Sequence, residues 1–178
     1  MRPITLTPLL LLVTFVATAH AAEPVAATAE PPAEMRDDPR CGMTLLLLNA
    51  PVPTSIEVGI PAFPGAIFSG ATGAGTGELN NVSYDVLASV FLLTTADPDE
   101  VAAFYREALD DSWQHGTAFG SHVFYQHEPV DDVVELLFER PGALPVVEIV
   151  EVWSDCDRLL VPGARSAIRL YYPPRSGD

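Results

Sequence analysis

The chain contains no lysine, and its nine arginines face 24 acidic residues, which gives a formal charge of −15 at pH 7. A surface with this charge repels phosphate backbones and anionic lipid headgroups, and no basic stripe interrupts it. The sequence therefore argues against nucleic acid as a partner. The ordinary interpretation of the acidity is solubility, and an acidic recognition surface is the alternative.

Long apolar runs are also scarce. The N-terminal run from Pro8 to Ala17 spans only about ten residues, follows Arg2, and is followed by a small-x-small triplet, Ala-His-Ala, before residue 22. This pattern is typical of a secretory signal peptide, here residues 1–21. A spanning helix needs roughly 20 apolar residues, so a retained anchor is the less favoured alternative. We expect a periplasmic or secreted protein that does not span the membrane after signal cleavage.

Cysteine is limited to Cys41 and Cys156. In an exported chain such a pair predicts a disulfide, and two separate buried thiols are the alternative. The two residues do not form a CxxC motif, so we expect a structural bond rather than a redox-active pair. A bridge across a loop this long would contribute at most about 4–5 kcal/mol in the chain-entropy model.

The length leaves room for one domain. Residues 22–40 are rich in alanine, proline and acids without periodicity, which predicts a disordered linker. We expect a single domain over residues 41–174 and a short tail over residues 175–178. A glycine-rich loop is expected at residues 69–81. It lacks the lysine of a phosphate-binding loop and leads into a strand, so it is interpreted as a connector.

Apolar patterns predict several strands and a hairpin that turns near Gly120–Ser121. The expected strands cover residues 44–53, 54–61, 63–70, 82–95, 145–153 and 166–172.

One helix is expected at about 98–111. Asp97 is placed to cap it, Pro98 fits the first position, and Glu100 falls where it would complete a capping box. Residues 130–139 fit a second short helix, with a strand as the alternative. The predicted fold class is α+β, an antiparallel sheet with the 98–111 helix packed on one face.

No catalytic or cofactor-binding residue stands out, because the chain has no G-x-S-x-G motif and no isolated pair of carboxylates. His122 and His127 are five apart on an expected strand, so they should point to opposite faces. The candidate metal ligands are Asp110, Asp111 and His115. Zinc usually takes three or four protein ligands, so solvated surface residues are the alternative interpretation and no metal is assigned.

The "FPGA" stretch at Phe63–Ala66, the stretch "FLLTTADPDEVAAFYREAL" and Trp113 together resemble small exported bacterial domains of unknown function. Those domains share an aromatic-Pro-Gly-Ala motif, a strand, a capped helix containing "FY", and a Gly-Trp pair. The resemblance covers about Pro61 to Gln114. It departs at Ser112, where the pattern has glycine, and in the acidic end of the helix. It implies an α+β domain of the bacterial envelope and transfers no site residues.

Together these features favour an exported, non-enzymatic domain that binds an envelope protein or a small ligand. The alternative is an exported metal-dependent or hydrolytic enzyme that uses acidic and histidine residues. A purely structural envelope subunit is a third class.

Overall fold

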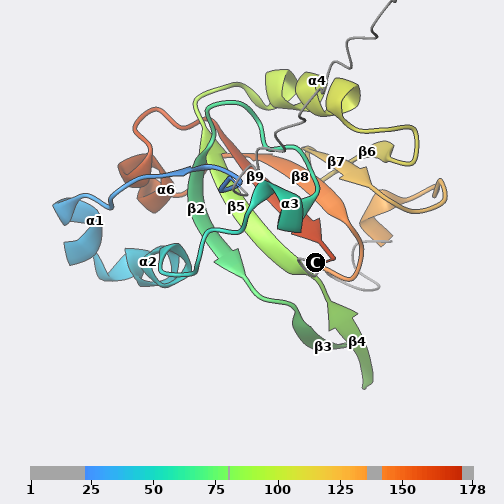
Figure 1. Cartoon of the computed structure of the whole chain (residues 1–178), viewed down its shortest axis with the longest axis horizontal. Coiled ribbons are helices and arrows are strands. Elements are labelled where there is room, and N and C mark those ends of the chain that lie inside the picture. Colours follow the sequence, from blue (N-terminus) through green and yellow to red (C-terminus); the bar gives the residue numbers. More distant parts are fainter. Residues whose placement is uncertain (1–22, 80, 136–141, 174–178) are drawn as a thin grey trace, which may run out of the picture.

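A seven-stranded sheet dominates the computed structural model, which describes residues 23–79, 81–135 and 142–173 (Figure 1). The strand order is β1-β2-β5-β9-β8-β7-β6. Their bounds are β1 Ala27–Thr28, β2 Ile67–Thr72, β5 Ala88–Thr94, β6 Gln114–Ala118, β7 Ser121–Tyr125, β8 Val146–Glu151 and β9 Ser166–Tyr172. β1 runs parallel to β2 and every other neighbouring pair is antiparallel, so the sheet is mixed.

The predicted fold class, an antiparallel sheet with one helix, is therefore wrong. The described part of the chain has six short helices. They are α1 Ala33–Asp37, the 3₁₀ turn η1 Pro39–Cys41, α2 Gly42–Leu48, α3 Ser55–Val58, α4 Pro98–Ala108 and α6 Asp155–Leu160. Most of them span two turns or fewer, which is too short to show a helical period in the sequence.

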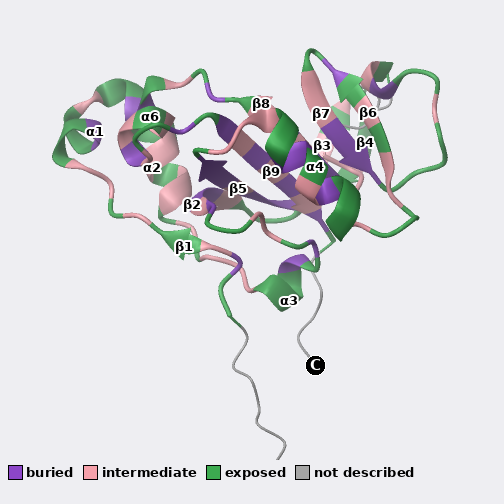
Figure 2. Cartoon of the chain, turned by 90° about the horizontal axis from the view of Figure 1, so that it is seen from above, coloured by how far each residue is buried: buried purple, intermediate pink, exposed green. Residues whose placement is uncertain are grey.

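α4 and α3 lie on one face of the sheet, over the apolar side chains of the central strands. This cluster includes Leu92 of β5, Ile149 of β8 and Ile168 of β9, all fully buried. Figure 2 shows the buried residues concentrated in these strands. α4 contributes Val101 and Tyr105, which are also fully buried, so its apolar stripe covers the sheet as its spacing indicated.

α4 begins at Pro98, as predicted, but ends at Ala108 rather than near residue 111. Asp97 caps it by accepting a hydrogen bond from the Asp99 N–H, not from Glu100. Beyond the helix, the Asp110 carboxylate accepts hydrogen bonds from the N–H and the hydroxyl of Ser112. Asp110 thus forms a local turn, which is what aspartate does more readily than continue a helix.

The opposite face of the sheet carries two smaller apolar clusters. One joins Leu93 to α1, η1 and α6, and the other places Val133 beneath the β6–β7 hairpin. Between them an ion pair joins Arg169 to Glu148 at 3.2 Å. The second face is therefore only partly covered by apolar packing.

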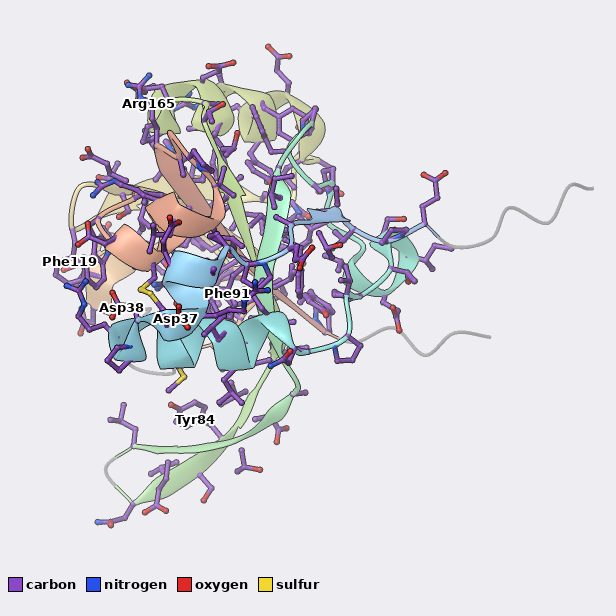
Figure 3. The ribbon with its side chains drawn as sticks, turned by 90° about the vertical axis from the view of Figure 1, so that its left-hand side faces the viewer. Asp37, Asp38, Tyr84, Phe91, Phe119 and Arg165 are labelled. Atoms are coloured by element: carbon purple, nitrogen blue, oxygen red, sulfur yellow. A yellow bond between two sulfur atoms is a disulfide. The ribbon has the colours of Figure 1, made fainter. Side chains whose placement is uncertain are left out.

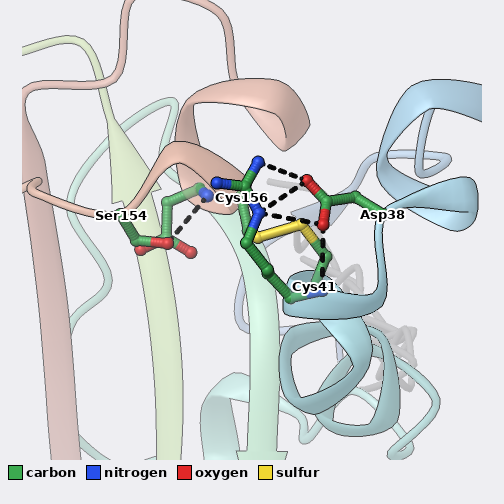
Figure 4. Close-up of polar contacts among 6 residues, drawn as sticks. Asp38, Cys41, Ser154 and Cys156 are labelled. Carbon is green, nitrogen blue, oxygen red and sulfur yellow. Dashed lines mark hydrogen bonds and ion pairs between the residues drawn. A yellow bond between two sulfur atoms is a disulfide. The ribbon is translucent and has the colours of Figure 1, made fainter.

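A disulfide joins Cys41 in η1 to Cys156 in α6, as predicted, with a Cα–Cα distance of 5.5 Å (Figure 4). Beside it, the guanidinium of Arg40 donates to both carboxylate oxygens of Asp38, which lowers the pKa of that carboxyl. Ser154 caps α6 through the Asp157 N–H. The bond therefore links η1, in the first part of the described residues, to the capped helix α6.

The structure differs from the disordered linker expected at residues 22–40. Within this segment, β1 pairs with the distant strand β2, and Met35 of α1 is fully buried. Met35 packs in the same apolar cluster as the two bridged cysteines, a contact between distant residues that the composition of the segment does not reveal. The predicted signal peptide at residues 1–21 and the tail at 175–178 lie outside the described residues.

Two predicted strands, residues 44–53 and 54–61, are wrong, because each contains a short helix. The leucine run forms α2, since leucine, which is not branched at Cβ, is a good helix former. α3 begins with a capping box in which Thr54 accepts from the Glu57 N–H and the Glu57 carboxylate accepts from the Thr54 N–H. α2 lies against β2, where its Leu47 closely approaches Gly70.

The glycine-rich segment forms an arm rather than a loop. β3 Gly75–Leu79 and β4 Val82–Val86 pair as a two-stranded ribbon that projects beyond the main sheet (Figure 1). The long strand expected at 82–95 is interrupted at Leu87, whose N–H donates to the Gly142 carbonyl at 2.7 Å. That bond holds the base of the arm.

For the helix or strand left open at 130–139, residues 133–135 are helical and residues 136–139 lie outside the described part. Among the described residues, no helix is long and apolar enough to cross a membrane.

Candidate functional site

A cavity of about 610 Å³ lies where the N-terminal end of α4 meets one end of the sheet. Its walls come from α4, the β6–β7 hairpin, the end of β8, α6 and the loop before β9. The lining residues are Asp97, Pro98, Asp99, Gly120, His122, Glu151, Val152, Arg158, Gly163, Ala164 and Arg165. Charged side chains of both signs therefore gather from four of these segments, and the hairpin adds a histidine.

The topology explains how these segments meet. β7, β8 and β9 are neighbours in the sheet, so the turn before β7, the end of β8 and the loop before β9 share one edge. Backbone bonds fix this edge: the Val152 N–H donates to the Arg165 carbonyl at 2.8 Å, and the Arg165 N–H donates to the Thr94 carbonyl at 2.9 Å. The chain from Thr94 then enters α4 directly.

Two arginines form one wall. The Arg165 guanidinium donates to the Asp97 carboxylate, so Asp97 both caps α4 and holds this arginine. Arg158 donates to the Val152 carbonyl at 2.5 Å. Figure 3 shows Arg165 beside α4 at the upper end of the molecule. The Arg165 side chain is still 60% exposed, so it can contact a ligand.

A chain of hydrogen bonds lies on the other side. His122 Nε2 lies 2.9 Å from Asp99 Oδ1, and His122 Nδ1 lies 3.3 Å from His115 Nε2. The two imidazole rings stack with their centroids 5.5 Å apart. Burial, the positive charge of Arg106 and the neighbouring His122 lower the pKa of His115, so its ring is neutral near pH 7.

The hairpin register places these histidines together. His115 pairs across the hairpin with Phe124, and His122 lies two residues before Phe124 on the same strand. The histidines are thus diagonal neighbours on one face of the sheet. The sequence analysis considered only the spacing of His122 and His127, so it did not predict the contact between His115 and His122. His127 Nδ1 donates to the Glu128 carbonyl at 3.0 Å, and His127 is not among the residues that line the cavity.

The candidate metal ligands Asp110, Asp111 and His115 do not form a metal site. Within the described ranges, no group of three or more His, Cys, Asp and Glu side chains is arranged to hold a metal ion. Asp110 is engaged with Ser112, and these hydrogen bonds lower the pKa of its carboxyl. His115 instead contacts His122 and the Phe124 ring.

Sequence reasoning missed Asp99, His122, Arg158 and Arg165 as one group. The two histidines could have been paired from the hairpin, because a turn at residues 119–120 fixes which residues share a face. No local signal brings the arginines to α4, since that depends on the strand order. Comparison of the chain with protein-family models, with curated proteins and with solved structures finds no match.

Proposed function

We propose that the chain is an exported, non-enzymatic domain that binds a small polar ligand in the cavity beside α4. The observation that carries this proposal is the cavity itself, whose walls bring two arginines, one histidine and three acids together. Ligand sites are concave and use a few convergent polar groups to orient what they bind. An envelope protein remains the alternative partner.

Export is supported by two independent features. Residues 1–21 have the composition of a secretory signal, and Cys41 is bonded to Cys156. Disulfides persist in oxidising compartments and are rare where thiols are kept reduced. The expected location is therefore the periplasm or the outside of the cell.

A binding role is favoured over catalysis by the chemistry of the wall. The described lining residues include no serine, threonine or cysteine, so the hydroxyl or thiol that a histidine base would activate is not among them. The arginines are held by Asp97 and by the Val152 carbonyl, which gives them fixed positions. Fixed donors suit recognition of a polar ligand.

The test is a thermal-shift screen of the purified chain against amino acids, small carboxylates, polyamines and sugars. We expect at least one compound to raise the melting temperature, and Arg165→Gln to remove most of that rise. Arg36→Gln is the matched control. Arg36 lies on α1, forms an exposed ion pair with Glu30 and does not line this cavity. Absence of any stabilising compound, or equal effects in both variants, would contradict the proposal.

The second candidate is a hydrolytic enzyme, favoured by the hydrogen-bonded chain from Asp99 through His122 to His115. A carboxylate that orients an imidazole is a common arrangement for a general base. Nitrophenyl esters, glycosides and phosphates provide the assay. Turnover that His122→Gln abolishes would establish this activity, and turnover that survives the substitution would assign it to a contaminant.

A further inference from the structure

Two imidazole nitrogens of the β6–β7 hairpin lie at the separation of two ligands on one metal ion. His115 Nε2 is 3.3 Å from His122 Nδ1. Zinc binds imidazole nitrogen at about 2.0–2.1 Å, so two nitrogens that share a tetrahedral zinc ion lie about 3.3–3.4 Å apart. The hairpin therefore already holds the two nitrogens at the spacing that such an ion requires.

Paired strands fix this spacing. His115 of β6 pairs with Phe124, and His122 of β7 pairs with Thr117, so the two histidines are diagonal neighbours on one face of the hairpin. The planes of the two imidazole rings differ by 23°. The Phe124 ring packs against the His115 ring at a centroid distance of 4.6 Å. Ligands carried by paired strands are positioned more precisely than ligands carried by loops.

Asp99 determines which nitrogen of His122 is free to bind. Its Oδ1 lies 2.9 Å from His122 Nε2, and an ionised carboxylate only accepts, so Nε2 carries the hydrogen. The neutral ring then has its lone pair on Nδ1, the nitrogen that faces His115. Histidines that bind metals almost always donate their other N–H to a carboxylate, a carbonyl or water in this way. When an ion binds, His115 keeps its own hydrogen on Nδ1 and presents the Nε2 lone pair.

Access and charge permit a cation at this position. His115 is exposed and the His122 side chain is 18% exposed, so a hydrated ion can reach both rings from solvent. The nearby charges oppose one another, because Asp99 attracts a cation and Arg106 repels it. The net charge of −15 favours cations over the molecule as a whole. No third His, Cys, Asp or Glu ligand joins the pair among the described residues, so water completes the coordination.

We propose that His115 and His122 form a binding site for one divalent transition-metal cation of the zinc class. Imidazole suits zinc, copper and nickel, whereas magnesium and calcium prefer oxygen ligands. With only two protein ligands, the site keeps open positions and binds far more weakly than a closed four-ligand site. His122 also lines the cavity beside α4, which places the ion at the cavity wall.

The test is isothermal titration calorimetry of the full chain, made without a histidine tag, with zinc chloride at pH 7.5. We expect one zinc ion per chain, and at least a tenfold loss of affinity in His115→Gln and in His122→Gln. His127→Gln is the matched control, because His127 bonds to the Glu128 carbonyl and should leave the affinity unchanged. Magnesium and calcium should not compete with zinc.

Two further variants keep the test valid if a histidine variant does not fold. Asp99→Asn should weaken zinc binding by about tenfold to a hundredfold, the usual effect of losing a carboxylate that orients a metal-binding histidine. Arg106→Gln should strengthen binding, because it removes the repelling charge. Equal affinities in these two variants would overturn the inference.

The inference would also be overturned if the natural chain did not bind zinc, or if His127→Gln reduced binding as much as His122→Gln. It does not depend on the polar ligand proposed for the cavity. If a compound of the thermal-shift screen binds through Arg165 while zinc does not bind, only the metal site is wrong. If zinc binds and no compound of the screen does, only the proposed function is wrong.

Discussion

His115 lies between three groups that determine its protonation. The Phe124 ring contacts it at a centroid distance of 4.6 Å, His122 stacks on it, and Arg106 adds a positive charge. Burial and these charges all favour the neutral imidazole. The folded state therefore binds fewer protons at this site than the unfolded chain does.

The pH dependence of stability follows from that difference. Because the pKa of His115 is lowered below its ordinary value of 6.5, acidification from above that value should reduce the free energy of unfolding. His115→Gln should make this decrease shallower between about pH 7 and pH 5, since the group that titrates there is gone. Urea midpoints of both proteins at each pH provide the measurement.

Arg106→Gln is the companion variant. It removes one of the charges that lower the His115 pKa, so the midpoint of the His115 resonances in an NMR pH titration should move to higher pH. Unchanged resonances, together with equal pH profiles for His115→Gln and the unmodified chain, would contradict this account.

At the scale of elements, the contact between α2 and β2 depends on the absence of a side chain. A Cβ added at Gly70 would lie 2.6 Å from the Leu47 Cβ, and the neighbouring Leu47 backbone is also within 3.4 Å. Backbone atoms cannot yield as the end of a flexible side chain can. The helix must therefore move if this glycine is replaced.

Gly70→Ala should destabilise the protein by about 1–3 kcal/mol, as expected for overpacking in a well-packed region. Gly73→Ala is the matched control, because Gly73 follows the same strand and has nothing within 4 Å of its added Cβ. Equilibrium unfolding in urea measures both. Equal midpoints for the two variants would show that α2 adapts without loss.

Elements with strong local signals could be predicted from the sequence. The cap at Asp97, the apolar strands β8 and β9, and the β6–β7 hairpin were all indicated by their own residues. α2 and α3 were not, because four to seven residues carry too little periodicity, although Thr54 and Glu57 have the spacing of a capping box. The arm of β3 and β4 is rich in glycine, which has low strand propensity, so its ladder of five cross-strand pairs was not indicated by its composition.

The candidate site shows the same division. The hairpin that carries His115 and His122 was predicted, but its turn lies one residue earlier than expected, at Phe119–Gly120. The approach of Arg165 to Asp97 depends on contacts between residues 68 positions apart. Local patterns hold no information about that distance.

At the scale of the whole molecule, the sheet and the disulfide hold together segments from opposite ends of the chain. β1 attaches to one edge through only two residue pairs, and Cys41 attaches the following helices to α6. The cluster around the bond includes Met35, Leu93 and Leu160. The segment before Cys41 therefore depends on this covalent link.

Replacing both cysteines by alanine should lower the free energy of unfolding by up to about 4–5 kcal/mol, because the bond closes a loop of 115 residues. Urea unfolding with and without a thiol reductant provides the measurement. Reductant should lower the midpoint of the natural chain and leave the double variant unaffected. A midpoint of the natural chain that reductant does not change would contradict the prediction.

The disulfide also has a consequence for how the molecule is made. Synthesis proceeds from the N-terminus, so Cys41 is synthesised 115 residues before Cys156. Its thiol must stay reduced until Cys156 has also been synthesised. With only two cysteines in the chain, no incorrect pairing within one molecule exists. The one available error joins two nascent chains, so the yield of correctly formed protein should fall as its rate of production rises.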